Sequence, residues 1–170
     1  INNVSVLELG VAGGNGIIAL EKYKKSIEKY LNIKIDIYGF DTGEGMPAST
    51  LKEDLPFVFK PGQFKIDKEA VSKKINSKIY DGDIKDTIVE FINSKPNKIS
   101  CIFFDMDYYS STKSFMSQIE NLRKYLLPRV LCYFDDLHLP EKYISDVNGV
   151  LLAINEFNSL NTKCKFGTNV

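Results

Sequence analysis

The stretch that decides the fold is VSVLELGVAGGNGIIALEKY, residues 4–23. An apolar run continues to Leu9, four glycines follow between residues 10 and 16, and a pattern of helical spacing then begins. Glycines between a strand and a helix let the backbone approach a bound phosphate, dinucleotide or nucleoside. The stretch therefore predicts a strand, a ligand-binding turn and a helix at the start of an α/β domain.

Short apolar runs alternate with helical periodicity along the rest of the chain, which is typical of βαβ units. We expect one domain over residues 1–170, with a doubly wound, mostly parallel α/β sheet and helices on both faces. We also expect a fragment of a longer chain with truncated terminal elements. The expected strands are Val4–Leu9, Ile33–Phe40, Lys78–Tyr80, Ile99–Phe104, Val130–Phe134 and Cys164–Gly167. The expected helices are Ile17–Leu31, Asp67–Ile75, Asp86–Asn93, Ser111–Leu126 and Asn148–Ser159.

Two segments carry further expectations. In the first expected helix, Ile17–Leu31, the residues Leu20, Tyr23, Ile27 and Tyr30 recur at helical spacing. The segment Thr42–Phe64 is rich in Gly, Pro and Phe and has no regular period. A long irregular insertion in a compact domain is usually functional, so this segment predicts a lid or a substrate wall.

Composition excludes several classes of function. The 22 basic and 22 acidic side chains cancel, so no global field favours nucleic acid or an anionic membrane. No apolar run reaches the roughly 18 residues that a membrane helix needs. The three cysteines lack metal-binding spacing, and Cys101 and Cys132 lie inside apolar runs, as buried thiols do in a reducing compartment. We expect a cytoplasmic protein, and its oligomeric state stays open.

Acids stand where each of the first five apolar runs ends. They are Glu8, Asp41, Asp81 with Asp83, Asp105, and Asp135 with Asp136. Parallel strands point their carboxyl ends at one edge of the sheet, where ligands bind. Any single acid could cap the following helix. Five together are better explained by a cation, a hydroxyl-rich ligand or a proton that relieves their repulsion.

The glycine turn favours a nucleoside with an ammonium group over a pyrophosphate. Its segment Gly10-Val11-Ala12 lacks the second glycine of a dinucleotide fingerprint, G-x-G-x-x-G. An acid at Glu8, two residues before the first glycine, suits an ammonium group. Asp41, at the end of the second strand, is placed to accept hydrogen bonds from ribose hydroxyls.

These motifs resemble class I S-adenosylmethionine (SAM)-dependent methyltransferases. The segments GFDTGEGMP (39–47), FFDMDYYSST (103–112) and YFDDL (133–137) are similar to motifs of the macrocin O-methyltransferase (TylF-like) family, and DGDIKDTI (81–88) fits the segment that contacts adenine in the superfamily. The chain departs from the family at Ala12, in LLPRVLCYFDD (126–136) before the acid pair, and in the short sequence after Gly167. The resemblance covers roughly residues 4–137, and it implies a Rossmann-like methyltransferase fold.

The resemblance also implies a site. SAM would contact Glu8, Gly10, Val11, Ala12, Gly14, Asp41, Thr42, Asp83, Ile84 and Asp105. A divalent cation, expected to be Mg²⁺, would be held by Asp105, Asp135 and Asp136. Such a cation would orient an acceptor hydroxyl and lower its pKa.

Two further residues are candidates for proton transfer. Asp107 is a base, a supporting partner or a helix anchor. His138, the only histidine, is a general base or an ordinary surface residue. Ser111 or Thr112 is expected to cap the helix that follows.

Three functions fit these observations. The first is a SAM-dependent, Mg²⁺-assisted O-methyltransferase that acts on a hydroxylated small molecule such as a sugar. The second is a nicotinamide-dependent oxidoreductase on the same kind of sheet, which Ala12, Glu8 and the acid pair disfavour. The third is a non-catalytic relative that binds the nucleoside.

Overall fold

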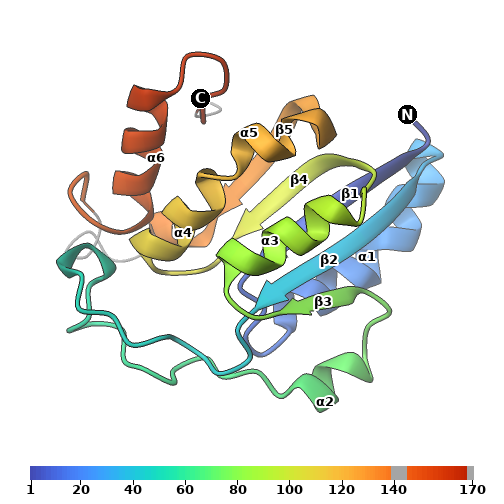
Figure 1. The fold of residues 1–170 in the computed structure, drawn as a ribbon. Helices are drawn as coiled ribbons and strands as arrows, with labels where there is room; N and C mark the ends of the chain where they lie inside the picture. The colour runs from blue at the N-terminus through green and yellow to red at the C-terminus, as the bar shows by residue number, and fades with distance from the viewer. Residues whose placement is uncertain (139–144, 168–170) are drawn as a thin grey trace.

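A parallel five-stranded sheet forms the centre of the molecule (Figure 1). The structure, a computed structural model, describes residues 1–138 and 145–167. The strands are β1 (Asn3–Leu9), β2 (Lys34–Asp41), β3 (Lys78–Asp81), β4 (Lys98–Phe104) and β5 (Leu126–Phe134), in the order β3-β2-β1-β4-β5. Every neighbouring pair is parallel, which confirms the expected α/β fold. The order reverses between β1 and β4, so the glycine turn after β1 lies at the switch point where such sheets bind ligands.

Helices cover both faces of the sheet, with α3 and α4 in front and α1 behind in the view of Figure 1. The helices are α1 (Asn15–Leu31), α2 (Lys68–Ser72), α3 (Ile84–Asn93), α4 (Tyr109–Met116), α5 (Ile119–Leu122) and α6 (Gly149–Leu160). Three 3₁₀ helices join them: η1 (Lys52–Asp54), η2 (Arg123–Tyr125) and η3 (Asp135–His138). None of these helices, within the described ranges, is long and apolar enough to cross a membrane.

The central strand β1 explains why the opening apolar run is nearly continuous. All residues from Val4 to Leu9 are buried, because neighbours pair with both edges of β1 and helices cover both of its faces. Leu7 and Leu9 belong to the larger core under α3, α4 and α6, whereas Val4 and Val6 belong to a smaller core on the other face.

Helix α1 forms as expected, but most of its apolar stripe faces away from the sheet. Ile17 is its one fully buried side chain, Leu20 is half-buried, and Tyr23 and Ile27 are exposed. Tyr30 is 88% exposed. The helix meets the sheet near its first turn, where Ile17 lies over Gly39 and would collide with any larger side chain there. The apolar stripe therefore lies on the surface.

Three other expectations are corrected in the second half of the chain. The expected helix Ser111–Leu126 is divided into α4, α5 and η2, and β5 begins at Leu126 rather than Val130. Cys164–Gly167 is not a strand. Its backbone binds α6 instead, because the amide side chain of Asn158 accepts the N–H of Phe166 and donates to its C=O, both at 2.8 Å.

Candidate active site

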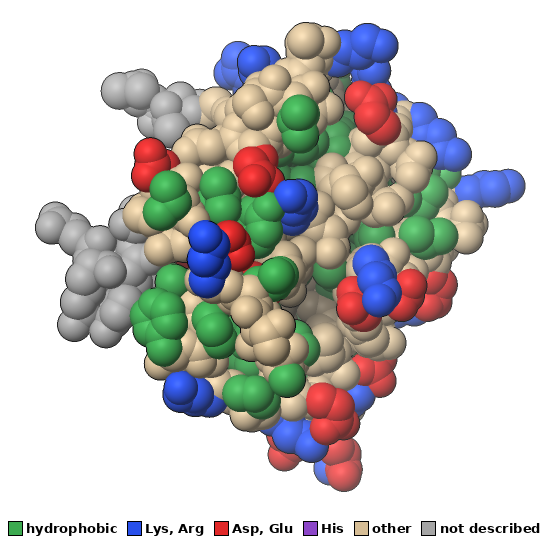
Figure 2. Space-filling model, turned by 60° about the vertical axis from the view of Figure 1, so that its left-hand side comes forward, with side chains coloured by type: hydrophobic (Ala, Val, Ile, Leu, Met, Phe, Trp, Pro, Cys, Tyr) green, Lys and Arg blue, Asp and Glu red, His purple; other side chains and the backbone are tan. Residues whose placement is uncertain are grey.

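The carboxyl ends of the strands open onto a cavity of about 610 Å³. Its walls come from the turns after β1 and β2, the first turns of α3 and α4, and the acids after β4 and β5. Figure 2 shows this side of the molecule, with hydrophobic side chains gathered around the hollow and charged side chains between them. This is the edge at which open α/β sheets bind ligands.

The cavity brings together most of the predicted site residues. Those that line it are Gly10, Ala12, Asp41, Thr42, Asp83, Ile84, Asp105, Asp107, Asp135 and Asp136. Glu8, Val11 and Gly14 do not line it: Glu8 is buried beneath the glycine turn, and Val11 and Gly14 are buried residues of the turn itself. The side chain of His138 lies outside the part of the chain that the structure describes.

Asp41 organises the two turns that border the nucleoside side of the cavity. Its Oδ2 accepts the backbone N–H groups of Val11 and Ala12, both at 2.9 Å, and its Oδ1 accepts the N–H of Gly43 at 2.6 Å. A carboxylate offers about four acceptor positions. These three contacts give Asp41 a structural role in holding the two turns. They leave about one acceptor position for a ribose hydroxyl.

Glu8 is a buried carboxyl group with an unused oxygen. It is 5% exposed, and its Oε2 has no hydrogen-bond partner in the described part of the chain. A side chain at Gly16 would collide with its Oε1, so Glu8 lies directly beneath the first turn of α1. Burial, followed by the charges of Asp105 and Asp41, raises the pKa of Glu8 to about 8. A cationic ligand group nearby would favour its ionised form.

The acid after β3 has a structural role of its own. The Oδ1 atom of Asp83 accepts the N–H of Lys85 at 2.9 Å, so Asp83 is the N-cap of α3. Asp83, Ile84 and Lys85 all line the cavity. The segment thus forms a wall beside the end of β2, where the adenine contact is expected.

Four aspartates gather where β4 and β5 end. Asp136 is buried and accepts the N–H of Asp107 at 3.1 Å, and Asp107 has φ 58°, a left-handed conformation that L-residues rarely adopt. Burial raises the pKa of Asp136, and burial with repulsion from Asp136 raises the pKa of Asp107. Burial, then the charges of Asp136 and Asp135, raises the pKa of Asp105 to about 6. The cluster therefore holds protons close to neutral pH.

These aspartates do not form a ready-made metal cage. Within residues 1–138 and 145–167, no group of three or more His, Cys, Asp or Glu side chains is arranged to hold a metal ion. Asp136 is directed at the N–H of Asp107, and Asp135 accepts the hydroxyl of Tyr133 at 3.0 Å. The donors have the oxygen chemistry that Mg²⁺ requires, but their present arrangement does not fit the expected site.

The segment after β2 is a wall of the cavity, and a buried acid anchors it. Asp54 is 1% exposed and accepts the hydroxyls of Ser49 at 2.6 Å and Ser110 at 2.8 Å, and the N–H of Ser110 at 2.8 Å. We call these three residues the inner anchor. The hydroxyl of Tyr108 donates to the C=O of Pro47 at 3.0 Å, which fastens the same segment to the start of α4.

The inner anchor corrects the expected cap of α4. Asp54, which lies 56 residues away, accepts the free N–H in the first turn, so neither Ser111 nor Thr112 is the cap. Thr112 is fully buried, and Ser111 lines the cavity with Ser110 and Ser114. The spacing of these serines, which places them on one side of a helix, was the sequence signal that could have revealed this wall.

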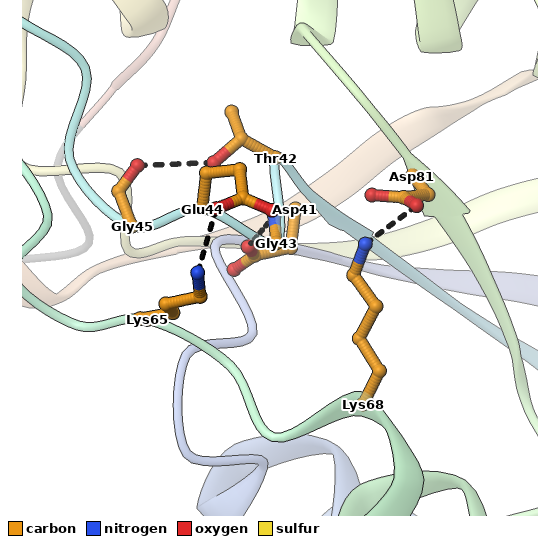
Figure 3. Close-up of polar contacts among 8 residues, drawn as sticks. All are labelled: Asp41, Thr42, Gly43, Glu44, Gly45, Lys65, Lys68 and Asp81. Atoms are coloured by element: carbon orange, nitrogen blue, oxygen red, sulfur yellow. Dashed lines mark hydrogen bonds and ion pairs between the residues drawn. The ribbon is translucent and has the colours of Figure 1, made fainter.

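The outer end of the same segment crosses the ends of β2 and β3. Lys65 pairs with Glu44 at 2.7 Å, and Lys68 pairs with Asp81 at 2.6 Å. Figure 3 shows both lysines reaching from one stretch of chain to these acids, beside the turn that Asp41 holds. We call residues 62–68 the outer strap.

Comparisons with known proteins bear on the fold. No family model matches the chain, and no curated protein matches it. Several solved structures are similar, and three of them are methyltransferases described as follows. CalS11, a calicheamicin methyltransferase, is 22% identical with a TM-score of 0.72, over 92% of this chain and 65% of that one. The apo form of CalS11, described as a TDP-rhamnose 3'-O-methyltransferase, is 21% identical with a TM-score of 0.60, over 92% and 64%. The O-methyltransferase NovP is 17% identical with a TM-score of 0.54, over 72% and 52%.

The chain thus spans about two thirds of the length of CalS11 and about half that of NovP. The expected likeness to the TylF-like family stays a prediction. At these identities the comparison concerns the path of the backbone, and it shows that this chain has the Rossmann-like α/β fold of these methyltransferases.

Proposed function

We propose that this chain is a SAM-dependent O-methyltransferase domain that acts on a hydroxylated small molecule such as a sugar. The observation that carries the proposal is a cavity at the switch point of the sheet. It joins a nucleoside-type wall, with Asp41 and Asp83, to the rim of acids at Asp105 and Asp107. The similar structures bear the names of O-methyltransferases, one of them for a TDP-sugar, which supports this class of reaction.

The chain would bind the cofactor along the turns after β1, β2 and β3. Gly10, at φ 90°, lets the first turn lie against the backbone of Asp105, where a side chain would collide with the carbonyl oxygen. Asp41 would offer its remaining acceptor position to a ribose hydroxyl, and Ile84 an apolar surface to the base. Glu8, beneath the turn, would face the ammonium end and lose its proton there.

The acids would serve the acceptor. When bound, SAM supplies a methyl group on a positively charged sulfonium. Transfer to an acceptor hydroxyl would join that methyl carbon to the acceptor oxygen in place of the carbon–sulfur bond, and the hydroxyl proton would have to leave. Asp105 and Asp107 line the cavity where they could hold the hydroxyl in line and accept its proton. His138 stays a second candidate for this base.

Magnesium remains a separate hypothesis. Asp105, Asp135 and Asp136 would be its ligands, and we derive no step through it because their arrangement does not fit a cation. Calorimetric titration with Mg²⁺ tests this, with Asp135→Ala and Asp136→Ala as comparison variants. Identical heats from the wild type and both variants would remove the proposed cage without touching the cofactor assignment.

Calorimetry with S-adenosylhomocysteine, SAM and NAD tests the proposed function. We expect both SAM-type ligands to bind and NAD to give no heat. Binding of NAD alone would overturn the proposal and favour the oxidoreductase. Methyl transfer is then measured with labelled SAM against methyl glycosides and TDP-rhamnose. Binding without any transfer would favour the non-catalytic relative.

A further inference from the structure

Phe64 presents a large aromatic ring to the cavity without burying it. The ring lines the cavity and is 55% exposed. It makes no ring–ring contact within residues 1–138 and 145–167, whereas Phe59 of the same segment is buried and packs on Tyr108 at 5.9 Å between ring centroids. Phe64 also has φ 60°, which is unfavourable for an L-residue. Its position is therefore held by its surroundings and not by its own packing.

Contacts on both sides of Phe64 hold it there. Before it, Gln63 accepts the N–H of Met46 at 2.8 Å, and Gly62 donates its N–H to the C=O of Met46 at 2.9 Å. After it, Lys65 pairs with Glu44. Figure 3 shows that this pair lies beside the turn after β2. The outer strap is thus fixed at neighbouring residues while the ring between them faces the cavity.

The ring lies on the nucleoside side of the cavity. The outer strap is tied to Glu44, just after β2, and to Asp81, at the end of β3. These are the two strand ends from which Asp41 and Ile84 reach the same cavity. An exposed aromatic ring is suited to cover a flat heteroaromatic base, because stacking removes both surfaces from water.

We propose that Phe64 stacks on the purine ring of the bound cofactor and closes the nucleoside pocket from the side of the outer strap. This inference rests on the proposed function. It assigns to the irregular segment after β2 a direct part in cofactor binding, in addition to its part in forming the wall.

The test uses S-adenosylhomocysteine as the probe and Phe57 as the matched control. Phe57 is in the same segment and 69% exposed, but it does not line the cavity. By calorimetry, Phe64→Ala should raise the Kd about tenfold or more, the change that stacking of one base on an aromatic ring supports. Phe57→Ala should leave the Kd unchanged.

A second readout reports the contact itself. The chain has nine tyrosines but no tryptophan, so Phe64→Trp introduces a single tryptophan whose emission can be excited selectively at wavelengths that tyrosine does not absorb. S-adenosylhomocysteine should quench its emission, while the emission of Phe57→Trp should stay constant. The stacking proposal would be wrong if the wild type and Phe64→Ala had equal Kd values, or if Phe64→Trp bound the probe without quenching. Either result would leave the proposed function standing. Failure of the wild type to bind the probe would instead overturn the proposed function, and stacking with it.

Discussion

Charged groups hold the segment between β2 and α2 in opposite ways at its middle, beside α4, and at its ends, beside β2 and β3. At the inner anchor, the single carboxylate of Asp54 is buried and accepts three hydrogen bonds. At the outer strap, the pairs Lys65–Glu44 and Lys68–Asp81 are both exposed. A buried carboxylate that loses its partners is strongly destabilising, whereas an exposed ion pair contributes little. The comparison indicates a fixed wall beside α4 and a loosely held edge over the nucleoside pocket.

Removing Asp54 should have the largest effect on this comparison. Asp54→Ala leaves the hydroxyls of Ser49 and Ser110 and one backbone N–H unpaired, which should lower the free energy of unfolding by about 3 kcal/mol. Urea denaturation measures this. Ser110→Ala is the graded control, because it removes the hydroxyl contact and keeps the N–H contact. Equal losses in the two variants would contradict the central role of the carboxylate.

Glu8 sharpens the comparison because it is buried like Asp54, but one of its carboxyl oxygens has no hydrogen-bond partner among the residues that the structure describes. Its pKa is raised from 4.5 to about 8, so the folded chain binds more protons than the unfolded chain between these values. The free energy of unfolding should therefore fall as pH rises through this window. Glu8→Gln does not titrate, and its stability advantage should grow by about 3 to 4 kcal/mol between pH 5 and pH 8.

Denaturation of the wild type and Glu8→Gln at pH 5 and pH 8 measures this difference. An advantage that is the same at both pH values would show that Glu8 is ionised throughout. The changes in the free energy of unfolding should thus have opposite signs at the two acids: removing Asp54 destabilises the chain, whereas neutralising Glu8 stabilises it.

Tyr108 tests a second, uncharged contact that holds the segment beside the inner anchor. Tyr108→Phe removes the hydroxyl that donates to the C=O of Pro47 and leaves the ring packed on Phe59. We expect a loss of about 1 kcal/mol in the free energy of unfolding. Hydrogen exchange should rise at residues 46–59 before it rises in the sheet. An unchanged exchange rate there would mean that apolar packing alone holds the wall.

The outer strap should give the smallest change. Lys65→Ala and Lys68→Ala should leave the melting temperature close to that of the wild type, because both ion pairs are exposed and screened by salt. Limited proteolysis within residues 60–68 should nevertheless become faster, and the wild type should approach the variants in high salt. A large fall in melting temperature would contradict the distinction between the inner anchor and the outer strap.

Patterns along the chain predict the sheet and its acid-rich edge well. Each of the first five apolar runs is a strand, and Asp41, Asp83, Asp105 and Asp136 all reach the same cavity. This follows because burial on both faces makes the strands apolar throughout, and parallel strands end at one edge.

Contacts between distant residues could not be predicted. Nothing near Asp54 indicates that it would cap a helix 56 residues away, and nothing near Asn158 indicates that its amide would bind the backbone of Phe166. The stripe through Tyr23 and Tyr30 has helical spacing, but the packing of Ile17 on the sheet turns it outward. Each of these outcomes depends on tertiary packing, which spacing in the sequence does not encode.

The close approach at the glycine turn restricts which sequences can share this site. A side chain at position 10 would meet a backbone carbonyl, that of Asp105, so only glycine can stand there. At position 16 the obstacle is the side chain of Glu8, so a larger residue becomes possible if position 8 shrinks. Among homologous chains, position 10 should therefore be invariant, while positions 8 and 16 should change together.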